Sequence, residues 1–379
     1  MTESTQEAEA IQLKLNDLHT GLGAAMTVRN GWAVPANYGD VVREYAAVRS
    51  GRAGLIDLSS RGRVEVSGAD AVAFLDGMIT NDVKTLPDDG WFTAAFPTVL
   101  GRLVAVVRVL HTDKSFLFDS EEVTAAKVVQ LLSRFTAAGD FKVTELTNDF
   151  ALLSIQGRDA AAIVRDAINV DVVDLPRGRV SILEWRGHQI RIIRATHTGE
   201  DGFDLFVPAE SAGEIWTALS SAGAVPVGQD AFDVLRIEAG IPRHGIDMDE
   251  TNVVLETGLD EAVSFTKGCY IGQEIIARIH WRGHIAKRLS GLIIENGTVQ
   301  SGDKLLAEDG KEIGRITSAV SSPQLGRNVA LAFVKYDYLA NGTAVRVLSG
   351  SAEVAATVAA LPFVRGSWHS DEQATGDVS

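Results

Sequence analysis

The most informative stretch of this 379-residue chain reads Lys267-Gly268-Cys269-Tyr270-Ile271-Gly272-Gln273-Glu274. It contains the only cysteine of the protein, and its glycines predict a tight turn rather than a buried strand. Residues 267–288 carry five lysines and arginines but a single acidic residue, Glu274, in a protein whose net charge is −15. Because nearby cations stabilise a thiolate, Cys269 is a candidate reactive thiol.

Two other interpretations of Cys269 remain open from its sequence alone. A lone cysteine is most often an inert buried thiol. A zinc site with His280 and His284 would use the spacing of one helix face, but it has fewer thiolates than the usual structural sets, and Gly283 lies between the histidines. We therefore predict no metal site.

Upstream of this stretch, a strand, a glycine turn and a helix follow one another twice. Residues 64–74 predict this order with Gly68 at the turn, and residues 150–168 repeat it with Gly157. After about Ala286 the helical spacing ends, and glycines alternate with short β-branched runs. The sequence therefore predicts an α+β protein with duplicated units and a small C-terminal β-barrel.

Two shorter segments carry local predictions. Residues 31–40 are rich in turn formers and aromatic side chains, which favours an ordered loop. Residues 143–155 are apolar and β-branched enough to predict a strand.

Composition narrows the classes of protein to which the chain could belong. Apolar residues make up 46% and charged residues 22%, as in ordinary folded proteins and unlike disordered chains or collagens. The net charge of −15 argues against broad nucleic-acid binding, which needs clustered cations. A single cysteine excludes an intrachain disulfide, and it suits a reducing cytoplasm.

Several familiar segments and motifs are absent from the sequence. Residues 1–17 are polar and unlike a signal peptide, and the most apolar stretch, residues 103–110, is too short to span a membrane. We find no Walker A loop, no GxGxxG after a strand, no HExxH and no nucleophile elbow. Phosphate-cradling, zinc-protease and serine-hydrolase chemistry are therefore not expected.

Two further segments hold candidate polar sites. In residues 198–204, two glycines bracket Glu200 and Asp201, and a fixed carboxylate there could accept paired N–H donors from a heterocycle; a solvated hairpin turn is the alternative. In residues 235–245, Arg236 lies on an otherwise apolar helix and needs an anionic partner, which could be Glu238 or another structural carboxylate.

Together these segments resemble the glycine-cleavage T-protein (aminomethyltransferase) superfamily, and more narrowly its folate-binding YgfZ-type branch. Residues 267–274 match the K-G-C-Y-x-G-Q-E signature of that branch, and Arg278 and Arg282 match its continuation. Residues 55–75, 198–202 and 236–240 resemble motifs shared across the superfamily, in the expected order. The resemblance covers roughly residues 20–363.

The resemblance implies a three-domain ring, with duplicated α+β domains and a C-terminal β-barrel, whose central hole binds tetrahydrofolate or a one-carbon-substituted folate. The implied boundaries are 1–55 for the leader and the start of the first α+β domain, 56–145 for the second, 146–285 for the remaining folate-binding part, 286–362 for the barrel and 363–379 for a polar tail. Catalytic roles are implied for Cys269 and Lys267. The implied folate-binding residues are Glu200, Arg236, Tyr270, Gln273 and Asn81.

One departure from the T-protein pattern directs the functional prediction. T-proteins carry an Asp pair after a glycine turn, whereas residues 91–112 of this chain contain no carboxylate. Since this segment offers no group to relay a proton, the sequence argues against aminomethyl transfer. The signature instead favours a tetrahydrofolate-binding protein that supports iron–sulfur cluster assembly or repair through Cys269, with iron–sulfur client or assembly proteins as partners.

Two other functions stay open. The whole-chain resemblance supports a folate-dependent aminomethyltransferase or methyltransferase as the alternative. The basic segment 267–288 supports a binding module for RNA or a protein, although the acidic total opposes broad nucleic-acid affinity.

Overall fold

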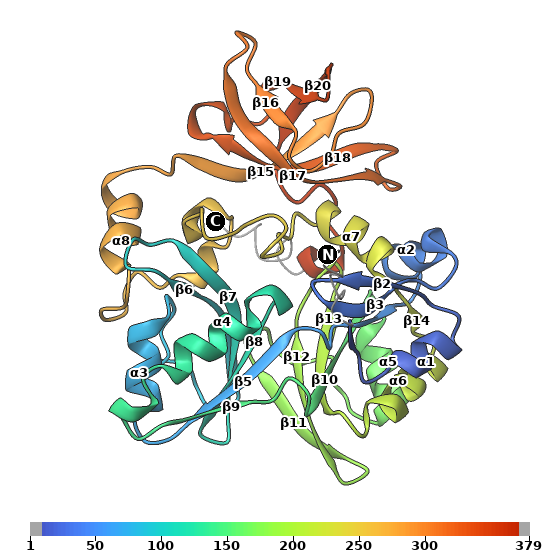
Figure 1. Cartoon of the computed structure of the whole chain (residues 1–379). Helices are drawn as coiled ribbons and strands as arrows, with labels where there is room; N and C mark the ends of the chain where they lie inside the picture. Colours follow the sequence, from blue (N-terminus) through green and yellow to red (C-terminus); the bar gives the residue numbers. More distant parts are fainter. Residues whose placement is uncertain (1–9, 371–379) are drawn as a thin grey trace, which may run out of the picture.

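The computed structural model describes residues 10–370 of the chain (Figure 1). Two large mixed α+β units lie side by side beneath a small β-barrel, which caps them at the top of the view. The predicted polar leader and polar tail extend into residues 1–9 and 371–379, which lie outside the described residues.

The first large unit is a five-stranded antiparallel sheet in the order β6-β7-β8-β5-β9. Its strands are β5 (Gly62–Ser67), β6 (Gly90–Pro97), β7 (Leu103–Thr112), β8 (Ser115–Ser120) and β9 (Lys142–Glu145). Helices α3 (Ala71–Met78) and α4 (Glu122–Ser133) cover it, and the 3-10 turn η1 (Thr136–Ala138) follows. The valines and phenylalanines of β7 and β8 form its core, because alternate strand residues point toward these helices.

The second large unit is a six-stranded sheet in the order β11-β12-β13-β10-β4-β14. Its strands are β4 (Gly54–Asp57), β10 (Phe150–Gln156), β11 (Val180–Trp185), β12 (His188–Arg194), β13 (Gly202–Pro208) and β14 (Val225–Pro226). Helices α5 (Ala160–Ile168) and α6 (Ala212–Ser221) bury Ile163 and Trp216 against one face. The chain passes between the two sheets right after β4, since β5 already belongs to the first sheet.

Smaller elements surround these sheets. A three-stranded sheet combines β1 (Ile11–Gln12), β2 (Ala25–Arg29) and β3 (Trp32–Asn37), next to α1 (Asn16–Gly21) and α2 (Val41–Arg49). Helix α7 (Gln229–Glu238) packs on β3 and α2, and α8 (Gln273–Arg282) leads toward the barrel. The remaining 3-10 turns are η2 (Val254–Glu256), η3 (Asp260–Ala262), η4 (Tyr336–Tyr338) and η5 (Ser367–His369).

The barrel closes in the order β15-β18-β17-β16-β19-β20. Its strands are β15 (Lys287–Ile294), β16 (Lys304–Leu306), β17 (Glu312–Ser322), β18 (Arg327–Lys335), β19 (Ala344–Ser349) and β20 (Ala352–Ala359). Closure pairs the backbone groups of every strand, so the barrel has no free edge. The predicted α+β class, with duplicated units and a C-terminal β-barrel, is confirmed.

The strand–glycine–helix repeat is present in both large units. Gly68 (φ 125°) separates β5 from α3, and Gly157 (φ 146°) separates β10 from α5. Both residues adopt backbone angles that only glycine takes without strain. These equivalent turns explain why the sequences of the two units share the order of strand, glycine turn and helix.

One local prediction was wrong, and another was right about extended structure but missed a break. The expected loop at residues 31–40 is mostly strand β3, because Trp32–Asn37 pairs with β2 on one side and β1 on the other. The expected strand at residues 143–155 is two strands in different sheets: β9 pairs with β5, and β10 pairs with β4 and β13. Strand propensity does not reveal which partner a segment meets, so the change of sheet was invisible.

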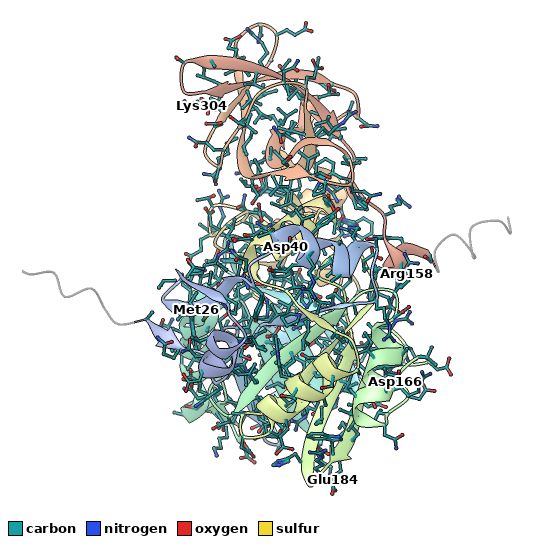
Figure 2. The ribbon with its side chains drawn as sticks, turned by 90° about the vertical axis from the view of Figure 1, so that its right-hand side faces the viewer. Met26, Asp40, Arg158, Asp166, Glu184 and Lys304 are labelled. Atoms are coloured by element: carbon teal, nitrogen blue, oxygen red, sulfur yellow. The ribbon has the colours of Figure 1, made fainter. Side chains whose placement is uncertain are left out.

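The side view in Figure 2 shows the barrel, with Lys304, standing above the body that carries Met26, Asp40 and Arg158. Among residues 10–370, no helix combines the length and the hydropathy that a membrane crossing requires.

Candidate functional site

A cavity of about 980 Å³ lies where the two large sheets meet the barrel. Its wall takes residues from β6 and β7, from residues 195–197 after β12, from the segment 240–261 and from β15. Trp91 and Trp368 add aromatic rings, and the guanidinium of Arg177 lies 3.8 Å from the centre of the Trp368 ring. The volume suits a small molecule.

The charged side chains of this wall are mostly cationic. Four arginines, two glutamates and two histidines line it among the described residues: Arg61, Arg108, Arg177, Arg288, Glu121, Glu261, His197 and His244. A ligand that carries carboxylates and a flat heterocycle would find complementary groups here.

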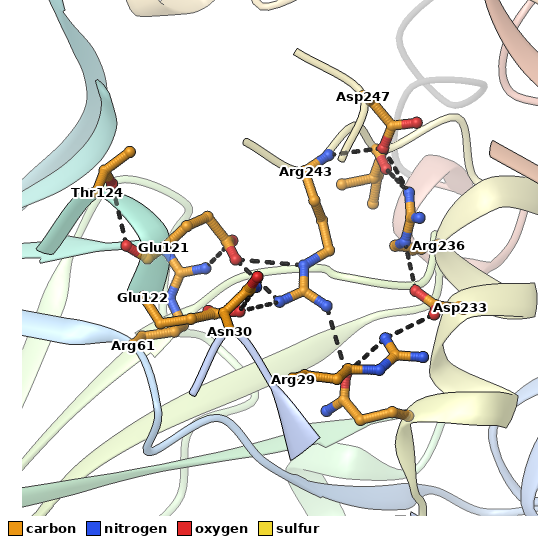
Figure 3. Close-up of polar contacts among 12 residues, drawn as sticks. Arg29, Asn30, Arg61, Glu121, Glu122, Thr124, Asp233, Arg236, Arg243 and Asp247 are labelled. Carbon is orange, nitrogen blue, oxygen red and sulfur yellow. Dashed lines mark hydrogen bonds and ion pairs between the residues drawn. The ribbon is translucent and has the colours of Figure 1, made fainter. Parts of the chain in front are cut away.

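One side of the cavity is built on a buried network of ion pairs (Figure 3). Glu121, just before α4, lies between the guanidinium groups of Arg61 and Arg243, and Arg243 Nη2 is 3.0 Å from its Oε2. Arg61 Nη2 also lies 2.8 Å from Asp119 Oδ2. Burial raises the pKa of Glu121, but Arg61 and Arg243 outweigh it and hold this pKa well below its usual range.

The same network continues to His197 through Arg108 on β7 and Asp204 on β13. On β7, Arg108 donates from Nε to Asp119 Oδ2 at 2.7 Å and pairs through Nη1 with Asp204 on β13. Asp204 is fully buried, and its Oδ2 lies 2.8 Å from Nε2 of His197. Burial raises the pKa of Asp204, but His197 and Arg108 outweigh it, so its carboxyl pKa is far below normal. Asp204 is therefore a permanent anion beside the histidine.

Two more titratable groups lie in the cavity wall. His244 is 7% exposed, and no hydrogen-bond partner for its Nδ1 exists among the described residues. Burial lowers the pKa of His244. Partial enclosure raises the pKa of Glu261, whose side chain faces the cavity.

Glu200, the predicted pterin-binding residue, does not line this cavity. Its Oε1 accepts a hydrogen bond from Arg49 Nη1 at 2.8 Å, and its Oε2 accepts two from Ser367, through N and Oγ, each at 2.7 Å. It borders a smaller surface pocket of about 510 Å³ with Arg158 and Arg365. Both carboxylate oxygens therefore already have partners within the chain.

Arg236, the second predicted folate contact, is 2% exposed and holds the barrel to the body. It lies 2.8 Å from Asp233 and 2.7 Å from Asp247, and it donates to Ser318 on β17 at 3.0 Å. Figure 3 shows Arg236 between the two aspartates. The sequence expectation of an anionic partner was right, although the partners are not Glu238.

Lys267 is inside the protein rather than in the cavity. Its Nζ donates to the backbone carbonyls of Asp76, Ile79 and Asn81 at 2.7–2.9 Å and lies 3.1 Å from Asp76 Oδ1. Asn81 itself donates to the carbonyl of Thr93 at 3.0 Å. Both side chains fix the end of α3 against the neighbouring segments.

The rest of the signature splits between core and surface. Tyr270 is buried, and burial raises its pKa to about 12. Cys269 is exposed, and Gln273 donates to the carbonyl of Gly268. None of the seven predicted site residues lines the central cavity, so Cys269 and Glu200 are not brought together there. Their roles toward a ligand stay predictions.

The sequence analysis missed the residues that do line the cavity. His197 of the cavity wall and Asp204, the buried anion behind it, lie at the two ends of the turn that drew attention to Glu200. Arg108 of the wall falls in a stretch noted for its apolar character and its lack of carboxylates. Two signals were available: a charged residue within the apolar strand 103–110, and a histidine and an aspartate at the two ends of one glycine turn. Among residues 10–370, no group of three or more His, Cys, Asp or Glu side chains is placed to bind a metal ion.

Comparison with known proteins covers nearly the whole chain. The GCVT N-terminal domain matches residues 15–267, and the glycine cleavage T-protein C-terminal barrel domain matches residues 287–365. Two similar proteins are the aminomethyltransferases of Herpetosiphon aurantiacus (31% identical, over 93% of this chain and 98% of the relative) and Rubrobacter xylanophilus (33% identical, over 93% of each chain).

A solved structure supports the same relationship. The glycine cleavage system aminomethyltransferase T from Bartonella henselae superposes with a TM-score of 0.86, at 26% identity, over 93% of this chain and 98% of that one. The three-domain fold predicted from the resemblance is thereby confirmed.

These comparisons correct the functional prediction. Support of iron–sulfur enzymes through Cys269 was wrong as the main interpretation, because the relatives matched over most of the chain are aminomethyltransferases. That interpretation depended on eight residues, and the structure shows packing reasons for part of them in the buried contacts of Lys267 and Tyr270. The alternative that followed from the whole chain is the better supported one.

Proposed function

Because the chain belongs to the glycine cleavage T-protein family of aminomethyltransferases, we propose that it transfers an aminomethyl carbon to tetrahydrofolate in the central cavity. The observation that carries this proposal is the cavity of about 980 Å³ lined by the sheets and the barrel of that fold. The absence of a carboxylate from β7 changes which residues do the chemistry, and other polar groups occupy the same wall.

The residues of the wall fit a folate in kind. Trp91 and Trp368 offer flat apolar surface to a heterocycle. Most donors of the lining arginines are paired within the chain, but Arg108 Nη2 has no hydrogen-bond partner among the described residues and is a donor for a carboxylate of a glutamyl tail. Tetrahydrofolate supplies the amine nitrogens that receive the carbon. The chain's own contribution is to hold this substrate, to keep the site enclosed and to manage the protons.

Two narrower statements belong to the same proposal. The signature at residues 267–274 is the support for a place in the YgfZ-type branch, and it leaves the proposed reaction unchanged. We place the reaction in the cytoplasm, because a chain with one cysteine cannot form an intrachain disulfide and its free thiol suits a reducing compartment.

The test measures tetrahydrofolate binding and ammonia release in the wild type and in a variant whose cavity is blocked. Wild-type protein should bind tetrahydrofolate saturably and release ammonia from an aminomethylated carrier protein. Thr93→Trp, which fills the cavity wall, should weaken binding at least tenfold, while Thr217→Trp on the exposed surface of α6 should not. No saturable binding by the wild type, or equal binding by Thr93→Trp, would reject this site.

The same titration tests the residues predicted from the resemblance. Glu200→Ala and Cys269→Ala can be compared with the wild type for affinity and for turnover, respectively. A tenfold loss of affinity in Glu200→Ala would mean that folate displaces Ser367 from this carboxylate. A loss of turnover in Cys269→Ala would mean that the thiol reaches the reacting atoms.

A further inference from the structure

We propose that His197, held by Asp204, is the catalytic residue that carries the proton between substrates in the central cavity. The inference rests on the proposed function and deepens it, because it assigns the acid–base group that β7 lacks. In this proposal, the buried ion pairs that run from Arg61 through Asp119 and Arg108 serve to hold Asp204.

The reaction requires a proton carrier. An aminomethylated carrier, X–CH2–NH2, reacts with the two N–H groups of tetrahydrofolate to give methylene-tetrahydrofolate, ammonia and X–H. Two C–N bonds to folate form, the bonds from carbon to X and to the amine break, and the two folate protons end on ammonia and on X. The step assigned to His197 takes one proton from the attacking folate nitrogen and delivers it to the departing amine, so the histidine is regenerated.

The geometry fixes which nitrogen does this. Asp204 Oδ2 lies 2.8 Å from His197 Nε2, and the carboxylate stays ionised because the positive charges of His197 and Arg108 outweigh the effect of burial and keep its pKa low. An ionised carboxylate only accepts hydrogen bonds, so Nε2 carries the hydrogen and Nδ1 keeps its lone pair. Arg108 pairs with the same carboxylate oxygen, and Asp119 in turn holds the Arg108 guanidinium through its Nε.

The ring is positioned by its backbone and neighbours as well. The His197 N–H donates to Gln156 Oε1 at 2.9 Å, and the ring meets Phe232 of α7 edge to face at 6.2 Å. Its side chain is 15% exposed and lines the cavity. Among the described residues, the charged and titratable groups that contact it or share its cavity wall are the following: Asp204, Arg108, Arg61, Arg177, Arg288, Glu121, His244 and Glu261.

The other titratable groups of the wall are less suited to the task. Glu121 is paired with two arginines, which keep it ionised and unable to hold a proton. Within the described residues, neither His244 nor Glu261 is held by a side-chain ion pair, whereas a base acts efficiently only in a fixed position. They are the competing assignments that the experiment must separate.

The kinetic test compares His197→Ala with the wild type. Loss of a general acid–base group lowers kcat by about 10²- to 10⁴-fold, and tetrahydrofolate affinity should stay within about threefold. Added imidazole should restore part of the activity of His197→Ala, because the truncation leaves room in the cavity. His188→Ala is the matched control, since His188 pairs with Glu210 at 3.7 Å on the surface and should keep full activity.

A spectroscopic test does not depend on activity. With 15N-labelled histidine, NMR of the wild type should show the Nε2–H tautomer for His197, and Asp204→Asn should lose it while lowering kcat. His197→Gln provides a second variant if His197→Ala folds poorly. An Nδ1–H tautomer in the wild type would overturn the assignment whatever the kinetics show.

The outcomes separate this inference from the proposed function. If the wild type neither binds tetrahydrofolate nor turns over, the function fails and the inference fails with it. If the wild type is active and His197→Ala retains its kcat, only the inference fails. A loss of kcat in Glu261→Gln or His244→Gln without one in His197→Ala would move the role to that residue.

Discussion

At the scale of single residues, the ammonium of Lys267 shows how a conspicuous motif can be structural. Two lysines share the carboxylate of Asp76: Lys267 has a fully buried side chain, and Lys84 is 61% exposed. Only Lys267 also satisfies three backbone carbonyls. Burial is the larger influence on Lys267 and lowers its pKa, so Asp76 and the backbone carbonyls offset only part of the cost of burying this charge.

We expect Lys267→Met to lower the free energy of unfolding by about 2–4 kcal/mol, because it leaves buried carbonyls without donors. Lys84→Met, which removes the exposed partner of the same carboxylate, should produce no measurable change. Urea unfolding of both variants is the measurement. Equal, small effects would show that Lys267 is dispensable for folding and return attention to its predicted catalytic role.

The carboxylate of Glu121 predicts how stability depends on pH. Its pKa is depressed in the folded protein by Arg61 and Arg243, so its contribution is complete above the ordinary glutamate pKa of about 4.3 and is lost as the pH falls below it. The free energy of unfolding should therefore drop less steeply in Glu121→Gln than in the wild type between about pH 4 and pH 3.

The control for this prediction is Glu214→Gln. Glu214 also pairs with an arginine, Arg186, but both side chains are about two-thirds exposed. The free energy of unfolding of Glu214→Gln should therefore fall with decreasing pH as steeply as that of the wild type. If the free energy of unfolding falls equally steeply with decreasing pH in the wild type and in Glu121→Gln, the assignment of a depressed carboxyl pKa is contradicted.

At the scale of secondary-structure elements, the glycine turns of the two large units are the feature that the sequence predicted best. At Gly157 the φ angle is 146°, and a Cβ would lie 2.5 Å from the carbonyl oxygen of Arg52 and 2.6 Å from Cα of Ala53. The backbone of the preceding segment cannot move aside as a flexible side chain could. The turn between β10 and α5 therefore requires glycine.

We expect Gly157→Ala to destabilise the protein by about 2 kcal/mol or more, through both backbone strain and the close contact. Gly77→Ala is the matched control, because Gly77 lies within α3 and a Cβ there has no neighbour within 4 Å. Alanine favours a helix, so that change should be neutral or slightly stabilising. Thermal unfolding of both variants distinguishes these outcomes, and similar shifts would contradict the argument.

Strand pairing marks the limit of local prediction at this scale. Residues 143–155 were correctly expected to be extended, but β9 and β10 join different sheets. Likewise, Trp32–Asn37 becomes a strand because β1 and β2 flank it, despite its turn-forming composition. The local sequence sets propensity, while the partners come from distant parts of the chain.

At the scale of the whole molecule, Asp247 connects the barrel to the body. It accepts hydrogen bonds from Thr317 and Ser318 of β17 at 2.7 and 2.6 Å, and it pairs with Arg236 of α7 at 2.7 Å. These buried contacts therefore hold β17 of the barrel against α7 of the body.

Arg236→Met should cost about 3–5 kcal/mol of stability, because it leaves the buried carboxylate of Asp247 without its cation. Hydrogen exchange should report the loss first at β17. Arg315→Met is the control, since Arg315 lies 3.6 Å from Asp249 and both side chains are about half exposed. Unchanged stability together with weaker tetrahydrofolate binding would instead support Arg236 as a ligand contact.

By itself, the sequence determined the α+β class, the duplicated units, the terminal barrel and membership of the T-protein superfamily. These features depend on apolar periodicity, glycine positions and local motifs, all of which are properties of neighbouring residues. Only the tertiary structure decided which polar groups share the cavity. Arg61 and Arg108 reach the cavity wall from two separate segments, and a third segment brings His197 to the wall with Asp204 buried behind it. Their arrangement depends on how the two sheets and the barrel pack together. A one-dimensional pattern holds no record of that packing, and for the same reason it singled out Cys269 and Glu200, which the fold leaves outside the cavity.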